Sequence, residues 1–359
     1  MPRKYFLGLA ILFLVILTGQ GCISRGGSAK GPMGIYRSTN KGDTWQPTAT
    51  VLTAQGIKSL STLKVYRVFP DPSDPNALYV TSRQQGLYYS YDRGDSWQAV
   101  SAMNGRFIYG FAIDPKDKCN LYASDGPNIY KSIDCSRTWK TIYTEERPDQ
   151  RLVGVKVDYG NSNLIYAALT GGDILVSENG GTKWRVVQRF GFQLREIEVD
   201  PNKGNRLYVA AYNQGLYRTD DAGANWIDLN EGLGSYSGSF EFSRLKINPT
   251  KKDSLFWIST YGILQSDDLG KTWRDIKLLT PPGSVKIYGF AVNPKNEKEM
   301  YYTGTILGEE NAHVRSTFYR TVDGGVNWVT KKLPSNTIPV IMEIHKDNPT
   351  YLYLGFTTL

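Results

Sequence analysis

Short apolar runs separated by clusters of Pro, Gly, Asp and Ser recur along almost the whole chain. One period contains a run that ends in Val68-Phe69-Pro70, then Leu78-Tyr79-Val80, then Gly86 to Ser90, and finally Trp97 to Val100. Runs of this length that are rich in β-branched and aromatic residues and bounded by turn residues are typical of β-strands. The same order returns every 42 to 55 residues, so the pattern predicts four short strands per repeat.

The third and fourth runs of each repeat are joined by a box, Ser-x-Asp-x-Gly-x-x-Trp. Seven copies begin at Ser38, Ser90, Ser132, Ser177, Thr219, Ser266 and Thr321, and they contain seven of the eight tryptophans. A set of carboxylate sites for metal or sugar is one interpretation, but Asn40 and Asn179 replace the acid in two copies. We therefore expect the box to fasten a turn, with Gly adopting a conformation that side chains oppose and Trp covering it. The acids given this structural role are Asp92, Asp134, Asp221, Asp268 and Asp323, and no metal site is predicted.

Seven repeats of four strands predict an all-β fold, a seven-bladed β-propeller with antiparallel blades. The chain ends support this, because only one run, Met33 to Ser38, precedes the first box. Two further runs, Ile341 to His345 and Tyr351 to Gly355, follow the last one. We predict that strands from the two ends share one blade and close the ring, which removes exposed sheet edges.

The first 22 residues have the features of an export signal. Arg3 and Lys4 precede an apolar run from residue 5 to 17, and Gly21 stands directly before Cys22. The run is short for a bilayer-spanning helix, which needs roughly 20 residues. The end of the segment resembles a bacterial lipobox, which implies that Cys22 is acylated and becomes the mature N-terminus. Ordinary secretion and an uncleaved anchor are the alternatives.

These features give a division of the chain into a signal (residues 1–22), a Gly- and Ser-rich tether (residues 23–32) and a propeller (residues 33–359). The lipid anchor would hold the protein at the bacterial cell membrane or outer membrane, facing the periplasm or the exterior. Export also permits disulfides. Cys119 and Cys135 lie in two turns that should meet at one edge of one sheet, so we predict that they pair; two unpaired thiols are the alternative.

The formal net charge of +8 falls to +6 without Arg3 and Lys4, and the remaining charges are mixed in sign. Nucleic-acid binding needs a clustered basic stripe, so no nucleic-acid partner is expected. The sequence contains no phosphate-binding Gly loop, no Ser-His-Asp arrangement and no zinc spacing, and we expect no cofactor. A monomer is expected.

The box resembles the Asp-box, or bacterial neuraminidase, repeat of sialidases, xyloglucanase-type glycoside hydrolases, sortilin-type receptor ectodomains and photosystem II assembly factors. The resemblance covers residues 33 to 359 and implies the propeller fold, but a fold does not settle a function. It implies either a non-catalytic module that binds an envelope protein or a glycan, or a glycoside hydrolase. Xyloglucanase-type enzymes use two facing propellers with one carboxylate from each, and this sequence carries the repeats of one.

Candidate site residues come from aligning the first strands of the repeats. One ring contains Arg67, Gly110, Gly154, Glu196, Arg244, Gly289 and Ile341. A second ring, two residues later, contains Phe69, Ala112, Lys156, Glu198, Lys246, Ala291 and Glu343. We expect these charges to converge near the axis. We also expect the functional site to lie on the face of the propeller opposite the boxes. They neutralise one another in a solvated channel, or they bind a polar ligand whose acidic group is held by Arg67 and Arg244.

The candidate ligand-binding residues are therefore Arg67, Arg244, Lys156, Lys246, Glu196 and Glu343. No catalytic residue is assigned for a binding module. If the protein is an enzyme, the candidates are Glu196, Glu198 and Tyr66, because a sialidase-like site needs an arginine triad, a Tyr nucleophile and acidic partners. The arginines available for such a triad are Arg67, Arg106 and Arg244.

Overall fold

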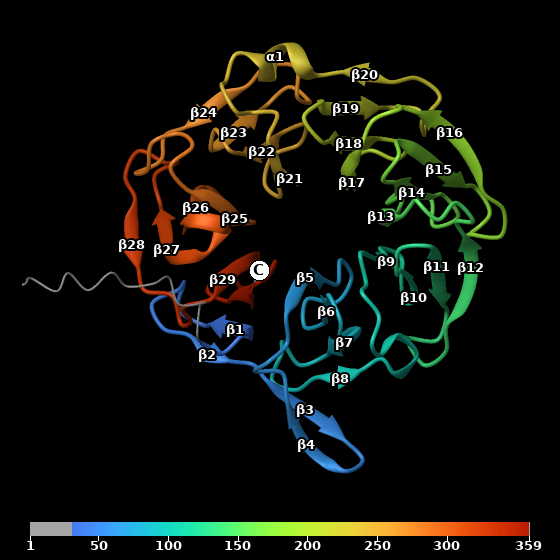
Figure 1. Cartoon of the computed structure of the whole chain (residues 1–359), viewed down its shortest axis with the longest axis horizontal. Coiled ribbons are helices and arrows are strands. Elements are labelled where there is room, and N and C mark those ends of the chain that lie inside the picture. The colour runs from blue at the N-terminus through green and yellow to red at the C-terminus, as the bar shows by residue number, and fades with distance from the viewer. Residues whose placement is uncertain (1–30, 359) are drawn as a thin grey trace, which may run out of the picture.

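The computed structural model describes residues 31–358 and arranges them as a closed ring of seven four-stranded antiparallel sheets around a central channel (Figure 1). The predicted all-β, seven-bladed propeller is confirmed. In each blade the first strand lies innermost and the fourth lies at the rim. Cys22 and residues 23–30 of the tether lie outside the described residues, so the lipidation prediction is not tested.

The blades follow one another along the chain. Blade 1 contains β5 (Val65–Pro70), β6 (Leu78–Ser82), β7 (Leu87–Ser90) and β8 (Gln98–Ala99). Blade 2 contains β9 (Gly110–Asp114), β10 (Asp117–Ser124), β11 (Asn128–Ser132) and β12 (Lys140–Thr144). Blade 3 contains β13 (Leu152–Val157), β14 (Ile165–Leu169), β15 (Asp173–Ser177) and β16 (Arg185–Arg189). Blade 4 contains β17 (Leu194–Val199), β18 (Leu207–Ala211), β19 (Gly215–Thr219) and β20 (Ile227–Asp228).

Blade 5 contains β21 (Phe242–Ile247), β22 (Leu255–Ser259), β23 (Ile263–Ser266) and β24 (Arg274–Ile276). Blade 6 contains β25 (Lys286–Asn293), β26 (Asn296–Leu307), β27 (His313–Thr321) and β28 (Val329–Lys331). Blade 7 contains β29 (Ile338–Ile344), β30 (Leu352–Thr357), β1 (Gly34–Ser38) and β2 (Gln46–Pro47). Three short helices, η1 (Ser101–Met103), α1 (Asn230–Gly234) and η2 (Glu309–Asn311), lie in connections within the described residues.

The sheet order of blade 7 is β2-β1-β30-β29, so strands from both ends of the described chain form one blade, as predicted. A hairpin that the repeat pattern did not predict, β3 (Thr50–Thr53) and β4 (Gly56–Ser59), follows this blade and projects from the ring (Figure 1). Near its base, Val51 forms a β-bridge to Trp97 of the blade 1 box. The hairpin has no counterpart in the other repeats, so periodicity could not reveal it.

An aromatic side chain of each second strand, opposite the second ring of the first strand, fills the space within the ring of blades. These residues are Tyr79, Tyr122, Tyr166, Tyr208, Phe256, Tyr301 and Tyr353, and all are fully buried. Each is the register partner of a residue of the second ring of the first strands, for example Tyr208 opposite Glu198. The bulky layer therefore fixes the spacing of the inner strands that carry the site residues.

Each box is a hydrogen-bonded turn. In blade 1 the hydroxyl Oγ of Ser90 accepts from the amide of Gly94 at 2.8 Å and donates to Asp92 Oδ1 at 2.7 Å, while Asp92 accepts from the amide of Ser96 at 3.0 Å. The amide oxygen of Asn179 takes the same place and accepts from the amide of Lys183 at 2.8 Å. An oxygen acceptor is therefore required and a charge is not, which agrees with a structural role.

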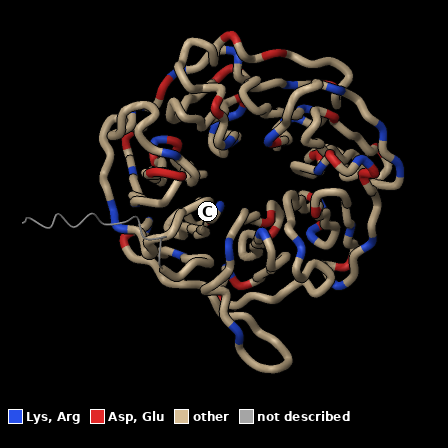
Figure 2. The backbone as a smooth tube through the Cα atoms, in the orientation of Figure 1, with Lys and Arg blue, Asp and Glu red and all other residues tan. Residues whose placement is uncertain are grey.

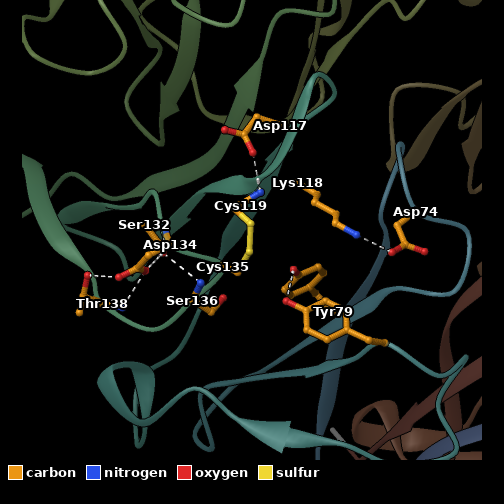
Figure 3. Close-up of a disulfide and its surroundings, with 11 residues drawn as sticks. Asp74, Tyr79, Asp117, Lys118, Cys119, Ser132, Asp134, Cys135, Ser136 and Thr138 are labelled. Atoms are coloured by element: carbon orange, nitrogen blue, oxygen red, sulfur yellow. Dashed lines mark hydrogen bonds and ion pairs between the residues drawn. A yellow bond between two sulfur atoms is a disulfide. The ribbon is translucent and has the colours of Figure 1, made fainter.

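One box is reinforced by a covalent bond. Cys135 and Ser136 occupy the two left-handed positions of the third box, with φ values of 57° and 72°, where the equivalent blade 1 residues are Arg93 and Gly94. Cys135 forms the predicted disulfide with Cys119, which lies near the start of β10 and not in the turn before it, so the bond joins β10 to the box (Figure 3). Its amide also donates to the carbonyl of Cys119 at 3.2 Å. The bridge thus holds a turn in which a non-glycine residue carries an unfavourable conformation.

We expect the double substitution Cys119→Ser and Cys135→Ser to lower the free energy of unfolding by about 3 kcal/mol, because the bridge restricts the unfolded chain. Guanidinium unfolding followed by tryptophan fluorescence measures this. A reductant should lower the midpoint of the wild-type protein to that of the variant and leave the variant unchanged. Equal midpoints of variant and oxidised wild type would contradict the prediction.

Candidate functional site

Backbone irregularities aim side chains into the channel from the first strands. The register between first and second strand shifts just before Arg67, before Glu196 and before Arg244. Similar shifts precede Gly154 and Ile341 in the same ring. A bulge bends its strand and re-aims the next side chain. The sequence alignment found the ring but gave no signal for the bulges, since one extra residue leaves no mark in so short a run.

The channel contains a pocket of about 340 Å³. Its lining includes all six predicted ligand-binding residues, Arg67, Arg244, Lys156, Lys246, Glu196 and Glu343, and also Glu198. Lys, Arg, Asp and Glu positions of both signs are visible on the inner strands around the opening (Figure 2). The prediction that these residues converge near the axis is confirmed, while their role in binding stays a prediction.

The pocket lies in the half of the channel nearest the boxes. Its lining runs from the first ring to residues at or just after the ends of the first strands, among them Pro72, Tyr159, Pro201 and Pro249. These turns are on the same face as the boxes, because strands of a blade alternate in direction. The expectation that the site would be on the opposite face is therefore wrong. The bulges place the first-ring side chains at the end of the pocket that is farther from the boxes, where they form its floor.

An ion pair crosses the channel at the floor of the pocket. Arg67 Nη1 of blade 1 lies 2.5 Å from Glu196 Oε1 of blade 4, and Glu196 Oε2 accepts from the amide of Leu245 at 3.3 Å. Glu196 is only 4% exposed. Burial opposes ionisation of this carboxyl group, but the guanidinium groups of Arg67 and Arg244 outweigh it and keep the pKa of Glu196 below its usual value.

The second ring contains two more ion pairs. Lys156 Nζ donates to both carboxylate oxygens of Glu198 at 2.8 Å, and Lys246 Nζ lies 2.6 Å from Glu343 Oε1. Each carboxylate of the pocket is thus paired with a cation. A general acid or base needs a carboxyl group free to exchange a proton with the substrate. The arrangement favours binding over acid–base chemistry.

Arg244 is the cation that remains. Within residues 31–358 no carboxylate lies within ion-pair distance of it, and its Nη2 donates only to the carbonyl of Val340 at 3.3 Å. Its Nε is buried and has no hydrogen-bond partner among the described residues. Burial, together with the positive charge of Arg67, lowers the pKa of Arg244. The pocket therefore has one positive charge in excess and an unused donor, which is the requirement of an anion site.

Two candidates for a sialidase-like site do not line the axial pocket. Arg106 pairs with Asp125 at 2.5 Å and donates to the hydroxyl of Tyr130 at 2.8 Å, so the proposed arginine triad is not formed. Tyr66 packs edge-on against Phe107 with ring centroids 4.9 Å apart, and it lies beside the floor of the pocket, where Arg67 Cζ is 5.7 Å from the centroid of its ring. The sequence alignment could not distinguish these residues from those that line the pocket, because it gave their positions along the strands and not the directions of their side chains.

No family profile matches the chain. Among curated proteins it is 25% identical over 212 residues to xyloglucanase Xgh74A of Acetivibrio thermocellus, a match that covers 54% of this chain and 22% of that protein. It is also 25% identical over 261 residues to a xyloglucanase of Hypocrea jecorina, covering 67% of this chain and 29% of the relative. The chain thus spans less than a third of the length of these relatives.

Solved structures share the fold at low identity. The GH74 xyloglucanase from Xanthomonas campestris superposes with a TM-score of 0.64 at 17% identity, covering 82% of this chain and 51% of the enzyme. YCF48 bound to a D1 peptide superposes with a TM-score of 0.60 at 17% identity, covering 83% and 93%. The protein is a seven-bladed β-propeller with an axial pocket, similar in fold to xyloglucanases and to YCF48. No helix in the described residues is long and apolar enough to cross a membrane.

Proposed function

We propose that this protein is a non-catalytic binding module of the cell envelope, exported and anchored through a lipid on Cys22, and that its axial pocket holds an anionic group of a protein or glycan partner. The observation that carries the proposal is Arg244, the cation left without a carboxylate and with a buried, unused Nε donor. A buried donor without a partner costs free energy that a bound anion would recover.

Three further observations support this proposal. The carboxylates Glu196, Glu198 and Glu343 are each engaged by a cation. The disulfide between Cys119 and Cys135 suits an oxidising compartment outside the cytoplasm. YCF48, a neighbour of comparable length, is described in complex with a peptide. A propeller of this size is therefore a suitable frame for holding one segment of a partner.

Binding of small probes tests the site. We expect glucuronic acid and a short peptide with a free C-terminal carboxylate to bind in calorimetry, and glucose and the amidated peptide not to bind. Arg244→Gln should lower the affinity for the anionic probes by about 10- to 100-fold. This factor corresponds to about 1.5–3 kcal/mol, the contribution of a hydrogen bond to a charged group. Arg185→Gln, at an exposed outer strand, is the matched control.

Thermal unfolding of Arg244→Gln should be measured alongside, to show that the ring remains folded. Equal binding of charged and uncharged probes, or unchanged affinity in folded Arg244→Gln, would contradict the anion site.

The second candidate function is glycoside hydrolysis, which the 25% identity to xyloglucanases favours. Release of reducing ends from xyloglucan measures it directly. Turnover that is abolished in Glu196→Gln or Glu198→Gln would overturn the non-catalytic proposal. The absence of turnover under conditions where the anionic probes bind would support it.

A further inference from the structure

The two central strands of blade 6 are longer than their counterparts. β27 has nine residues, whereas the third strands β7, β11, β15, β19 and β23 have four or five. The outer strand β28 pairs only with Phe318, Tyr319 and Arg320. The first half of β27, His313 to Thr317, is therefore an outer edge without a neighbouring strand in the described part of the chain. Such an edge presents unpaired N–H and C=O groups.

A groove runs beside this edge. A cavity of about 560 Å³ lies between His313–Thr317 and a segment that begins at the last residue of β28, Lys331, and continues to Asn336. That segment is fixed, because Leu333 and Ser335 are buried and Ser335 Oγ donates to the carbonyl of Pro32 at 2.7 Å. No backbone hydrogen bond between residues 31 and 358 joins the two walls. The groove therefore has one wall of unpaired strand edge and one wall of anchored chain.

The lining of the groove is basic. Arg315 and Lys332 are exposed, and Lys331 and His313 add further cationic or polar character. No Asp or Glu belongs to the lining, and the one acid paired with Lys331 is Asp43, which lies outside the groove. A partner that binds here must satisfy backbone groups and carry negative charge.

We propose that the free edge of β27 binds an extended acidic segment of a partner protein, which adds to blade 6 as an outer strand beyond the end of β28. Addition of a strand to an exposed sheet edge is an established mode of peptide recognition, in which main-chain hydrogen bonds supply affinity and side chains supply specificity. This surface is at the rim of blade 6, separate from the axial pocket, and does not depend on the anion site there (Figure 1).

The probes are three end-blocked peptides. One is acidic, Thr-Glu-Val-Glu-Val-Glu-Thr; the second replaces each Glu with Lys; the third is the acidic peptide N-methylated at each residue between its two threonines, so that neither strand edge keeps its N–H donors. We expect the acidic peptide to bind in fluorescence polarisation and to slow hydrogen exchange in residues 313–317. The Lys peptide and the N-methylated peptide should each bind at least about tenfold more weakly, because charge and backbone donors are both required.

The double substitution Arg315→Glu and Lys332→Glu should lower the affinity for the acidic peptide by about tenfold or more. The control Lys140→Glu, at an exposed position of the outer strand of blade 2, should leave this affinity unchanged. Binding that N-methylation leaves unchanged, or that Arg244→Gln abolishes instead, would overturn the proposal. So would protection of residues 313–317 by anionic lipid vesicles and not by peptide, which would make this a membrane-facing surface. Slow hydrogen exchange of residues 313–317 in the protein without peptide, if it became fast on deletion of residues 23–30, would show that the chain covers its own strand edge. That result would also overturn the proposal.

Discussion

A chain that ends at Tyr351 should not fold into a stable ring. The deletion removes β30, which lies between β29 and β1 and is their only link in blade 7 of the described structure. It also removes Leu352, Tyr353, Leu354 and Phe356, each at most 1% exposed. Four buried side chains of this kind contribute about 6–12 kcal/mol, comparable to the about 5–15 kcal/mol that stabilises a whole domain.

Circular dichroism and limited proteolysis measure this outcome. We expect loss of the near-ultraviolet signal and rapid digestion throughout the chain, and not only in blade 7, because opening one blade exposes the edges of its neighbours. The matched control replaces eight residues of the projecting hairpin, Leu52 to Ser59, with a short Gly-Ser link; most of these side chains are exposed. If the truncated chain kept the unfolding midpoint of this control, closure by β30 would not be essential.

The second large effect is expected from Glu196→Gln. The substitution leaves Arg67 in the floor of the pocket without its carboxylate partner, and it also removes the negative charge that acts at longer range on the guanidinium of Arg244. Removing one partner of a buried ion pair costs about 3–5 kcal/mol, because the other charge stays buried and uncompensated. The matched control is Glu198→Gln in the second ring, where the side chains of Lys156 and Glu198 are each about one-fifth exposed. We expect a smaller loss from this control, because Glu196 is only 4% exposed and Glu198 remains in contact with water.

The loss caused by Glu196→Gln should also depend on pH. The pKa of Glu196 is lower in the folded protein than in the unfolded chain, where it is about 4.3, so its ionised form stabilises the fold. This contribution is complete above the unfolded pKa and disappears as the pH falls through the lower, folded pKa. Chemical unfolding at pH 7 and at decreasing pH below 4 should therefore show the difference between wild type and variant shrinking with acid. A difference that stays constant to low pH would contradict the assigned pairing.

Replacing the pair by apolar residues separates charge from packing. Arg67→Met combined with Glu196→Leu should recover part of the stability lost in Glu196→Gln, because a buried ion pair is often replaceable by well-packed apolar side chains. The recovery should be incomplete, since Arg244 then loses the nearest negative charge.

Most of the architecture was predictable because it repeats. The box recurs in each blade, and so does the pair of an apolar residue and an aromatic residue in the second strand, so Tyr79 and Tyr208 are buried for the same local reason. The pairing of Cys119 with Cys135 followed from two turns at one edge of one sheet. His345 directly follows its first strand, at the position that Asp71 takes in blade 1, and its Nδ1 accepts from the amides of Asp347 and Asn348. What does not repeat, such as the β3–β4 hairpin, was missed.

The candidate site was predictable as a set of residues and not as an arrangement. The alignment brought Arg67, Glu196 and Arg244 into one ring, but it could not show that Arg67 takes Glu196 and leaves Arg244 free. It also placed the site on the wrong face, and it grouped Arg106 with Arg67 and Arg244 although Arg106 pairs with Asp125 and does not line the pocket.

The sequence by itself thus determined the number of blades, the turns that fasten them, the closure of the ring and the identity of the charges at the axis. These follow from period, turn chemistry and strand alternation, which act over a few residues. Only the tertiary structure decided which cation each carboxylate binds, on which side the pocket lies and which strand edge stays uncovered. Those outcomes depend on one-residue bulges and on contacts between blades more than a hundred residues apart, as between Arg67 and Glu196, where a small shift changes the partner.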